Sequence, residues 1–319
     1  MYIIDILQSP QLIKRFCRDY NVPVSTFQYP YFEKQLETLS LYSTSYQKNF
    51  LDFIDEVREF NSAEDYFSYY NEVKEKIISY ITSHPQFESF SNMSFNKSSH
   101  SKKELYSVEN HTKTFVSIDM SKANFNIVKH HCPDMFEGKS WETVVKEFGG
   151  SAYLQNSKYM RQVIFGACNP KKQIQAQTEL MDLLASYLED HGVEIYSVVT
   201  DEIILKWKHS APTNELRGLL CEFCSTVFPI WSDIFKIEKF ILLHTPVGYV
   251  KGVIGDSGDL ISHTFKCVDS DIYCQFVKRF YGVPIEEHDL VFDYKGQLAK
   301  FTTPLENPWV NNININKEK

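Results

Sequence analysis

The sequence contains no long hydrophobic run. No apolar stretch approaches the roughly 18 residues that a membrane-spanning helix requires. The N-terminal stretch MYIIDILQSPQLIKRF carries Asp5 inside its apolar run and lacks a basic head and a small-residue cleavage site, unlike a secretory signal. These absences predict a soluble protein without a membrane partner, located in the cytoplasm of a cell or, for a phage-encoded protein, of its host.

Common catalytic motifs are missing as well. The sequence has no phosphate-binding loop of the Gly-Lys-Ser type, no dinucleotide-binding glycine fingerprint and no Gly-x-Ser-x-Gly nucleophile elbow. The widespread enzyme classes that depend on those motifs are therefore excluded.

Cysteine is odd in number, with seven residues scattered over 319, which predicts reduced thiols in place of a disulfide framework. Cys221 and Cys224, together with His263 and Cys267, offer the donor types of a tetrahedral zinc site. A cysteine pair on an apolar helix more often packs in a core. Both interpretations stay open from sequence.

The chain is acidic, with a net charge of −8, which counts against a general nucleic-acid-binding surface because phosphate contacts need Lys and Arg. A nucleic-acid partner would require a local basic channel. With 43% hydrophobic and 23% charged residues, the composition is that of a globular protein, and the length favours two or three closely packed subdomains.

Helical spacing dominates the first 90 residues. Apolar residues from Tyr46 to Ile81 recur at helical intervals that are interrupted near Asn61, where Ser62 is a suitable N-cap. The polar segment 89–104 is rich in Ser, Asn and Lys and predicts a linker or mobile loop.

The middle of the chain alternates strands and helices. A β-branched strand at 115–118 runs into Asp119, and a helix capped by Ser121 is expected to extend to His131. Residues 171–191 predict a helix that ends at Gly192, with one apolar face formed by Ile174, Met181, Leu184 and Leu188. Residues 193–205 predict a β-hairpin with Asp201 and Glu202 at its tip, and the remaining elements are a helix at 213–228, strands at 239–243 and 247–254, a helix near 269–281 and a strand pair within 290–301.

Acidic residues thus stand at two strand ends, Asp119 and Asp201-Glu202, on either side of a basic segment. Each acid alone is explained by a helix cap or a solvated turn. Together, carboxylates from separate strands are what two divalent ions ~3.5–4 Å apart require for phosphoryl transfer. Magnesium prefers such oxygen ligands, and nearby cations can hold a triphosphate.

This order of strand, acid, helix, basic segment, helix and acidic hairpin resembles motifs A, B and C of right-hand nucleic-acid polymerases. The segment Asp119 to Phe125 is similar to motif A of reverse transcriptases, and residues 196–205 resemble motif C. The Asp201-Glu202 pair, in place of two aspartates, and Arg161-x-x-x-Phe165-Gly166 look more like family A DNA polymerases. The short intervals between the motifs suit reverse transcriptases and RNA-dependent polymerases better.

The resemblance implies a role for each matched residue. Asp119 and Asp201 would bind two Mg²⁺ or Mn²⁺ ions, and Glu202 would be an auxiliary ligand or would shape the primer terminus. Asn124 would occupy the sugar-gate position, where a small amide that can bond a hydroxyl predicts that ribonucleotides are tolerated or preferred. The nucleotide-binding set would be Asn124, Phe125, Lys158, Arg161 and Gly166, and Lys171 and Lys172, at the unfavourable end of a helix dipole, would face nucleic acid.

The expected fold is α+β, with an antiparallel palm sheet and its helices at residues 111–250. A helical, fingers-like region would precede it at 1–110, and a thumb-like or accessory region would follow at 251–319. The expected function is metal-dependent, template-directed synthesis of DNA or RNA from nucleoside triphosphates on a primer or template, by an enzyme of a phage, plasmid or other mobile element. Two alternatives remain: a template-independent terminal transferase or primer-making enzyme, and a non-catalytic binding or regulatory protein, which the acidity and the missing double aspartate favour.

Overall fold

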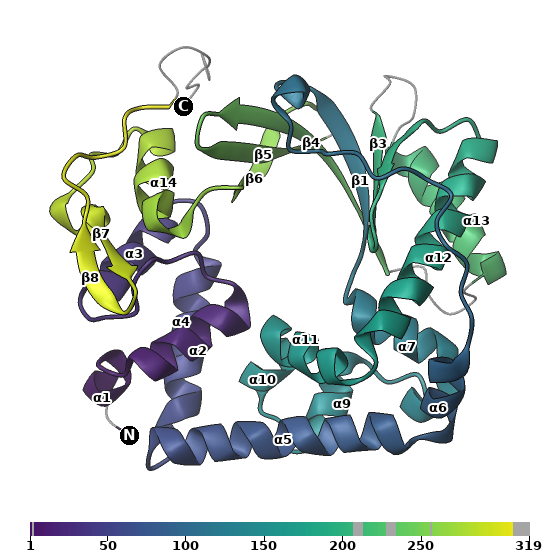
Figure 1. Ribbon diagram of the computed structural model, residues 1–319, viewed down its shortest axis with the longest axis horizontal. Helices are drawn as coiled ribbons and strands as arrows, with labels where there is room; N and C mark the ends of the chain where they lie inside the picture. The colour runs from purple at the N-terminus through teal and green to yellow at the C-terminus, as the bar shows by residue number, and fades with distance from the viewer. Residues whose placement is uncertain (2, 207–212, 228–233, 256, 309–319) are drawn as a thin grey trace.

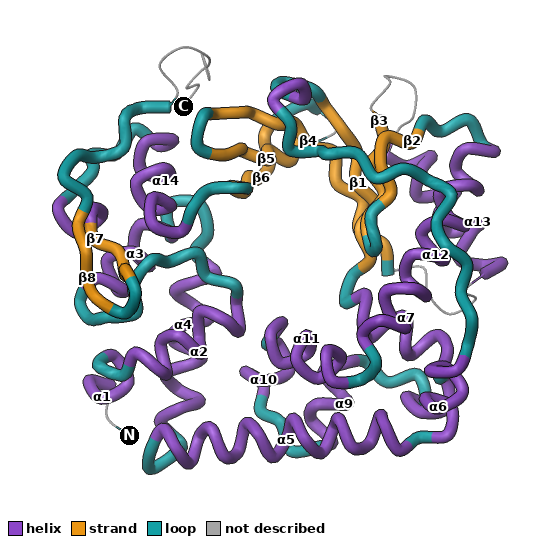
Figure 2. Tube along the Cα trace, in the orientation of Figure 1, coloured by secondary structure: helices purple, strands orange, loops and turns teal. Residues whose placement is uncertain are grey.

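The computed structural model describes residues 1, 3–206, 213–227, 234–255 and 257–308. The protein is α+β, as the sequence predicts: helices surround one antiparallel six-stranded sheet, and a separate two-stranded hairpin lies near the C-terminus. Figure 2 shows the six strands gathered in the upper part of the molecule, with helices along its sides and base. Within the described ranges, no helix combines the length and the apolar character needed to cross a membrane.

The six-stranded sheet has the order β2-β3-β1-β4-β5-β6, so the predicted hairpin β2-β3 pairs with the predicted strand β1 through β3. Strand β6 was not predicted, because its exposed outer face gives it a weak hydrophobic pattern. The strands are β1 (Thr114–Met120), β2 (Ile195–Val198), β3 (Glu202–Lys206), β4 (Phe235–Thr245), β5 (Gly248–Ile254) and β6 (Leu260–Lys266).

The two faces of the sheet differ in character. Side chains alternate along a strand, so Val116, Ile118 and Met120 of β1 enter the main hydrophobic core, while Asp119 and Phe115 lie on the opposite face. The helices α12 and α13 pack against the core-facing side, beside β3 and β1 in Figure 1. The helices that follow β1 are α7 (Ala123–His131), α8 (Pro133–Phe136), α9 (Trp141–Glu147), α10 (Ala152–Asn156), α11 (Lys158–Ala167), α12 (Pro170–Asp190) and α13 (Thr213–Val227).

The start of α7 differs from the prediction, since Lys122, not Ser121, occupies the N-cap position, in a left-handed backbone conformation. Ser121 instead extends the pairing of the sheet, because its N–H donates to the Ile234 carbonyl at 2.7 Å. The Asn126 side chain donates to the Ser121 carbonyl. Backbone hydrogen bonding to the neighbouring segment therefore extends one residue beyond the end of β1.

Helix α12 ends as predicted, with Gly192 at a φ of +77° just beyond it. Its predicted apolar face is partly wrong: Met181, Leu184 and Leu188 are buried, but Ile174 is 51% exposed. The buried position in that turn belongs to Gln173, whose Nε2 donates to the Phe165 carbonyl at 2.8 Å. A polar residue enters the core there because it satisfies a carbonyl at the end of α11.

The helices before the sheet surround an aromatic cluster that includes Phe16, Phe32, Phe50 and Phe53. Ser62 caps the long helix α5 as predicted, accepting a hydrogen bond from the Asp65 N–H at 3.1 Å. These helices are α1 (Ile3–Leu7), α2 (Pro10–Tyr20), α3 (Tyr31–Leu39), α4 (Ser45–Arg58), α5 (Ala63–Ser83) and α6 (Pro85–Asn92).

Helix α2 carries a buried ion pair whose carboxylate also bonds residues that follow α9. Arg15 binds both carboxylate oxygens of fully buried Asp19, at 2.7 and 3.0 Å, and stacks over the Tyr70 ring at 3.6 Å. The Asp19 carboxylate also accepts from the hydroxyls of Tyr153 at 2.9 Å and Ser157 at 2.7 Å. One carboxylate thereby fastens α2 to α10 and to the start of α11.

The predicted linker at 89–104 is partly helical, since α6 extends to Asn92. The rest is tied to α12: Asp182 accepts from Ser98 Oγ at 2.6 Å, from the Ser99 N–H at 2.9 Å and contacts His100 Nδ1 at 2.6 Å. Although burial opposes it, these hydrogen bonds lower the pKa of Asp182 to about 2.

We expect Asp182→Ala to release this segment and to destabilise the protein by about 1–3 kcal/mol, because several donors lose a charged acceptor. The contribution of Asp182 is present above the ordinary carboxyl pKa and declines as pH falls toward 2. Limited proteolysis should show faster cleavage between 93 and 104 in the variant. An unchanged cleavage rate would contradict the tethering role.

The C-terminal region packs against the N-terminal helices (Figure 1). The Val291 carbonyl accepts from Ser25 Oγ and Gln35 Nε2, each at 3.3 Å, and the Asp293 N–H donates to the Ser25 carbonyl at 2.8 Å. The predicted boundary at 250 falls inside β5, and β6 continues the same sheet. Beyond it lie η2 (Ser270–Ile272), α14 (Tyr273–Tyr281), η3 (Glu287–Leu290), β7 (Val291–Tyr294) and β8 (Gln297–Lys300).

Candidate functional site

The two acidic strand ends lie next to each other. Asp119 at the end of β1 is paired directly with Glu202 at the start of β3, and the Met120 N–H donates to the Asp201 carbonyl at 2.9 Å. Directly paired residues of antiparallel strands project to the same face. Asp119 and Glu202 therefore share the face of the sheet that lies away from the main core. Asp201 lies in the turn directly before Glu202.

The acids influence one another electrostatically. Burial, reinforced by the neighbouring Asp201 carboxylate, raises the pKa of Asp119. Burial likewise raises the pKa of Glu202, and the Asp119 and Asp201 charges add to the effect against the opposing charge of Lys251. Mutual repulsion of this kind is what a bound divalent cation relieves.

Further charged residues lie on this face, beginning with Lys236 of β4, which pairs in register with Asp119. Glu238 of β4 pairs in register with Ser117 of β1, two residues before Asp119. The Nζ atom of Lys251, a buried residue of β5, lies 3.2 Å from Glu238 Oε2 and 4.3 Å from the centroid of the Phe240 ring. Burial opposes the shift, yet hydrogen bonds from Lys236 and Lys251 lower the pKa of Glu238. These bonds favour the ionised form of Glu238. The ion pair with Glu238 holds the Lys251 side chain in place, within electrostatic range of Asp119 and Glu202.

More cations approach from β6 and α11. The partial loss of solvent around the Lys266 ammonium lowers its pKa, although much of the side chain is exposed, and the charges of Lys251 and Lys158 lower it further. The negative charge of Glu202 acts in the opposite direction and raises the pKa of Lys266. Lys158, predicted to contact a triphosphate, thus lies within electrostatic range of the basic side of the cluster.

Two other residues predicted to contact a nucleotide lie on helices: Arg161 on α11 and Asn124 on α7. Arg161 is partly buried on α11, which lowers the pKa of its guanidinium, while the charge of Glu142 on α9 opposes the shift. Glu142 also forms an ion pair with Lys122, which follows the sheet directly after Ser121. The side-chain oxygen of Asn124, Oδ1, accepts a hydrogen bond from Gln177 Nε2 of α12 at 2.8 Å. This bond fixes the orientation of the Asn124 side-chain amide, so that its NH₂ group points away from Gln177 Nε2.

Other predicted contacts are wrong or lack support from the geometry. Phe125 is 2% exposed and packs against Phe136, Trp141 and Phe165, so it belongs to the core and cannot contact a nucleotide. Lys172 donates to the Met93 carbonyl and lies over the Phe95 ring, which explains its place at the start of α12 without a phosphate. Lys171 and Gly166 are exposed, and no described contact links either residue to the acidic cluster.

The alternative zinc site is not formed by the described residues. Cys224 is 2% exposed within the main core, whereas Cys221, three residues earlier on α13, is exposed. His263 of β6 interacts with the Tyr281 hydroxyl at 2.6 Å. Core packing therefore accounts for Cys224, and in the described part of the chain no group of three potential ligands includes either cysteine.

The donors at the sheet face fit magnesium in kind, because carboxylate oxygens are its preferred protein ligands. In the described ranges, Asp119, Asp201 and Glu202 do not bring three ligand atoms within 4.8 Å of one another. Magnesium is commonly held by one or two carboxylates, with water and substrate phosphates as the other ligands. The arrangement suits an ion shared between the protein and a phosphorylated substrate better than a permanently enclosed one.

We expect Asp119→Asn to raise the melting temperature in metal-free buffer at neutral pH. A carboxyl whose pKa is raised in the folded state destabilises the fold when ionised, and protonation below the ordinary pKa of about 3.9 removes that penalty. Calorimetry in EDTA should therefore show a gain at pH 7 that shrinks toward pH 4. A loss of stability at pH 7 would mean that Asp119 is held by favourable contacts instead.

Sequence reasoning missed Glu238, Lys251 and Gln177. A signal for Lys251 was available, since a lysine inside the apolar run GYVKGVI needs a partner when the strand is buried. The identity of that partner depends on the pairing of β4 with β5, which the sequence does not specify. Gln177 gave no signal, because a glutamine on a long helix is ordinarily exposed.

The sequence was also compared with known proteins. No protein-family model matches it, and no curated protein matches it either.

Proposed function

We propose that this protein is a metal-dependent nucleotidyltransferase that extends a nucleic-acid strand with nucleoside triphosphates. The observation that carries the proposal is the position of Asp119 and Asp201 at adjoining strand ends, with Asp119 directly paired with Glu202. Burial raises the pKa of both Asp119 and Glu202, and the neighbouring carboxylates raise both further, so a cation at this position would offset unfavourable charge.

In the proposed reaction, the terminal hydroxyl of the strand attacks the α-phosphorus of the triphosphate and pyrophosphate leaves. Asp119 and Asp201 would hold the two Mg²⁺ or Mn²⁺ ions that assist this transfer. When bound, the ions stabilise the charge on the attacking and leaving oxygens. Glu202 acts as an auxiliary ligand or orients the terminus. Lys251 and Lys266 place positive charge near Glu202, and Lys158 lies within electrostatic range of Lys266, which suits a triphosphate or a phosphate backbone despite the acidic net charge.

The sugar of the nucleotide is proposed to lie near Asn124. Because Oδ1 of the Asn124 side chain already accepts a hydrogen bond from Gln177, the NH₂ group of the same amide is left to donate to a ribose hydroxyl. This arrangement favours ribonucleotides over deoxyribonucleotides. Gln177→Leu should free the amide to rotate and reduce the preference between the two sugars, with a smaller effect on the total rate.

The deciding experiment is extension of a labelled primer by the purified chain with Mg²⁺ or Mn²⁺. Ribonucleotides and deoxyribonucleotides are supplied separately, with and without a template strand. Asp119→Asn and Asp201→Asn are compared with Asp65→Asn, a matched change at an exposed position on α5. Extension that requires Asp119 and Asp201 but not Asp65 would establish the proposed chemistry.

The template-free reactions separate the two enzymatic alternatives. Extension that depends on the template sequence supports a template-directed polymerase, whereas equal extension without template supports a terminal transferase or primer-making enzyme. If the folded wild-type protein extends no strand with either metal, or if Asp119→Asn and Asp201→Asn leave extension intact, the proposal fails. A non-catalytic binding protein would then be the better account.

A further inference from the structure

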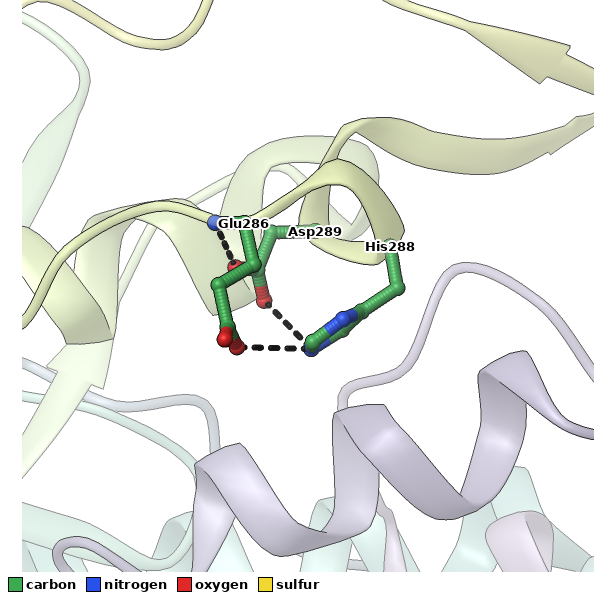
Figure 3. Close-up of side chains that lie close together, drawn as sticks. All are labelled: Glu286, His288 and Asp289. Atoms are coloured by element: carbon green, nitrogen blue, oxygen red, sulfur yellow. Dashed lines mark hydrogen bonds and ion pairs between the residues drawn. The ribbon is translucent and has the colours of Figure 1, made fainter.

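A second cluster of potential metal ligands lies far along the chain from the acidic strand ends. The short turn η3 directs the side chains of Glu286, His288 and Asp289 toward one another (Figure 3). One ligand atom from each residue lies within 4.8 Å of the other two. The His288 Nε2 atom is 3.4 Å from Glu286 Oε2 and 3.6 Å from Asp289 Oδ1.

Asp289 is the unusual member of this cluster, because its side chain is fully buried. Its Oδ2 atom accepts from Lys278 Nζ at 2.6 Å and from the Glu286 N–H at 2.7 Å. Its Oδ1 atom has no hydrogen-bond partner among the described residues and points toward the His288 ring in Figure 3. A buried carboxylate oxygen without a donor is unfavourable, so a cation at this position would supply what the protein does not.

The two separations from the His288 nitrogen to the carboxylate oxygens agree with tetrahedral coordination. Zinc bonds of ~2.0–2.1 Å to imidazole nitrogen and carboxylate oxygen place neighbouring ligand atoms about 3.3–3.4 Å apart. The observed 3.4 and 3.6 Å are close to that spacing. We propose that Glu286 Oε2, His288 Nε2 and Asp289 Oδ1 bind a zinc ion, with water as the fourth ligand.

The donor set selects a transition metal over magnesium or calcium. Imidazole is a good ligand for zinc and its neighbours, whereas magnesium and calcium favour oxygen alone. Lys278 compensates part of the negative charge of Glu286 and Asp289, so the affinity is lower than the carboxylates alone would give. Lys278→Met removes this competing cation and leaves Asp289 dependent on the metal.

A zinc ion here would stabilise the contact between the two ends of the chain. The turn η3 leads directly into Val291, whose carbonyl accepts from Ser25 and Gln35 of the N-terminal region. Fixing the turn would hold this carbonyl in place. Zinc is therefore expected to raise the melting temperature of the wild-type protein, and to raise it more in Lys278→Met.

The test is zinc titration of the metal-stripped full chain against a chromophoric chelator, with excess Mg²⁺ to occupy the acidic strand ends. We expect one zinc per chain and a loss of affinity of at least ~10–100-fold in His288→Gln, the loss that even outer-shell changes produce. His191→Gln, at an exposed position after α12, is the matched control and should bind normally. Cobalt bound to the wild type should give the intense visible bands of tetrahedral coordination, absent in His288→Gln.

The half-buried His288 and the exposed Glu286 can both be changed without opening the core, so Glu286→Gln serves as a second variant if His288→Gln does not fold. Absence of stoichiometric zinc from the wild type, or equal zinc affinity in folded wild type and folded His288→Gln, would overturn the proposal. Loss of zinc in Asp119→Asn with retention in His288→Gln would place the ion at the sheet instead.

Discussion

Asp119→Asn and Asp201→Asn should each reduce the rate of strand extension by at least about 10³-fold. Charge stabilisation by a bound metal ion is worth several kcal/mol in the transition state, and each 1.36 kcal/mol corresponds to a factor of ten in rate. Asparagine retains the size of aspartate but loses the charge that holds the ion. The loss should appear in single-turnover extension at saturating nucleotide, where the chemical step is measured.

Asp119→Asn also distinguishes a catalytic defect from misfolding. Asp119→Asn is expected to be at least as stable as the wild type in EDTA, because the ionised carboxyl is destabilised by burial and by Asp201. An inactive variant with an unchanged or raised melting temperature therefore supports a direct role for Asp119. Inactivity accompanied by lower stability would leave the metal-binding role without support. Glu202→Gln should have a smaller effect, as suits an auxiliary ligand.

Asp19→Ala should lower the free energy of unfolding by about 3–5 kcal/mol, the cost of removing one partner from a buried ion pair. The change leaves the Arg15 guanidinium, whose side chain is only 10% exposed, without its carboxylate. It also removes the acceptor of the Tyr153 and Ser157 hydroxyls, which join α10 and α11 to α2. Urea unfolding followed by circular dichroism measures the difference.

The exposed pair Lys34–Glu37 provides the control for Asp19. Both side chains are largely in solvent, at 47% and 59% exposure, so Glu37→Ala should cost less than about 1 kcal/mol. The double change Arg15→Met with Asp19→Leu should recover much of the loss, because no charge is then left buried. A cost for Asp19→Ala no greater than that for Glu37→Ala would show that the buried pair contributes little.

The elements that could be predicted are those with strong local patterns. Helical apolar spacing and a serine cap define α4 and α5, and two apolar runs around Thr200-Asp201-Glu202 define the hairpin of β2 and β3. The neighbourhood of Asp119 and Glu202 was expected only from the resemblance to polymerase motifs. Their direct pairing is a property of the β1–β3 register, which local patterns do not specify.

The rest could not be predicted, because it depends on contacts between distant segments. Glu238 and Lys251 meet only after β4 pairs with β1 and β5 with β4. Phe125 matched the spacing of a motif, but helix α7 turns its ring into the core. Ile174 is exposed on α12, and its neighbour Gln173 is buried in that turn with a hydrogen bond to the Phe165 carbonyl. Strand pairing brings Glu238 and Lys251 together, the orientation of α7 buries Phe125, and a tertiary hydrogen bond accompanies the burial of Gln173.

The bonds from Ser25 and Gln35 to the Val291 carbonyl join residues 266 and 256 positions apart. During synthesis, the N-terminal helices leave the ribosome long before Val291 does, so the Gln35 side chain, buried in the finished protein, can bond Ser25 Oγ but not the Val291 carbonyl in the meantime. Contacts of this span close late and slow folding. Nascent chains stalled before residue 291 should therefore remain susceptible to proteases and chaperones around α2 and α3, and emergence of Val291 from the ribosome should end that exposure.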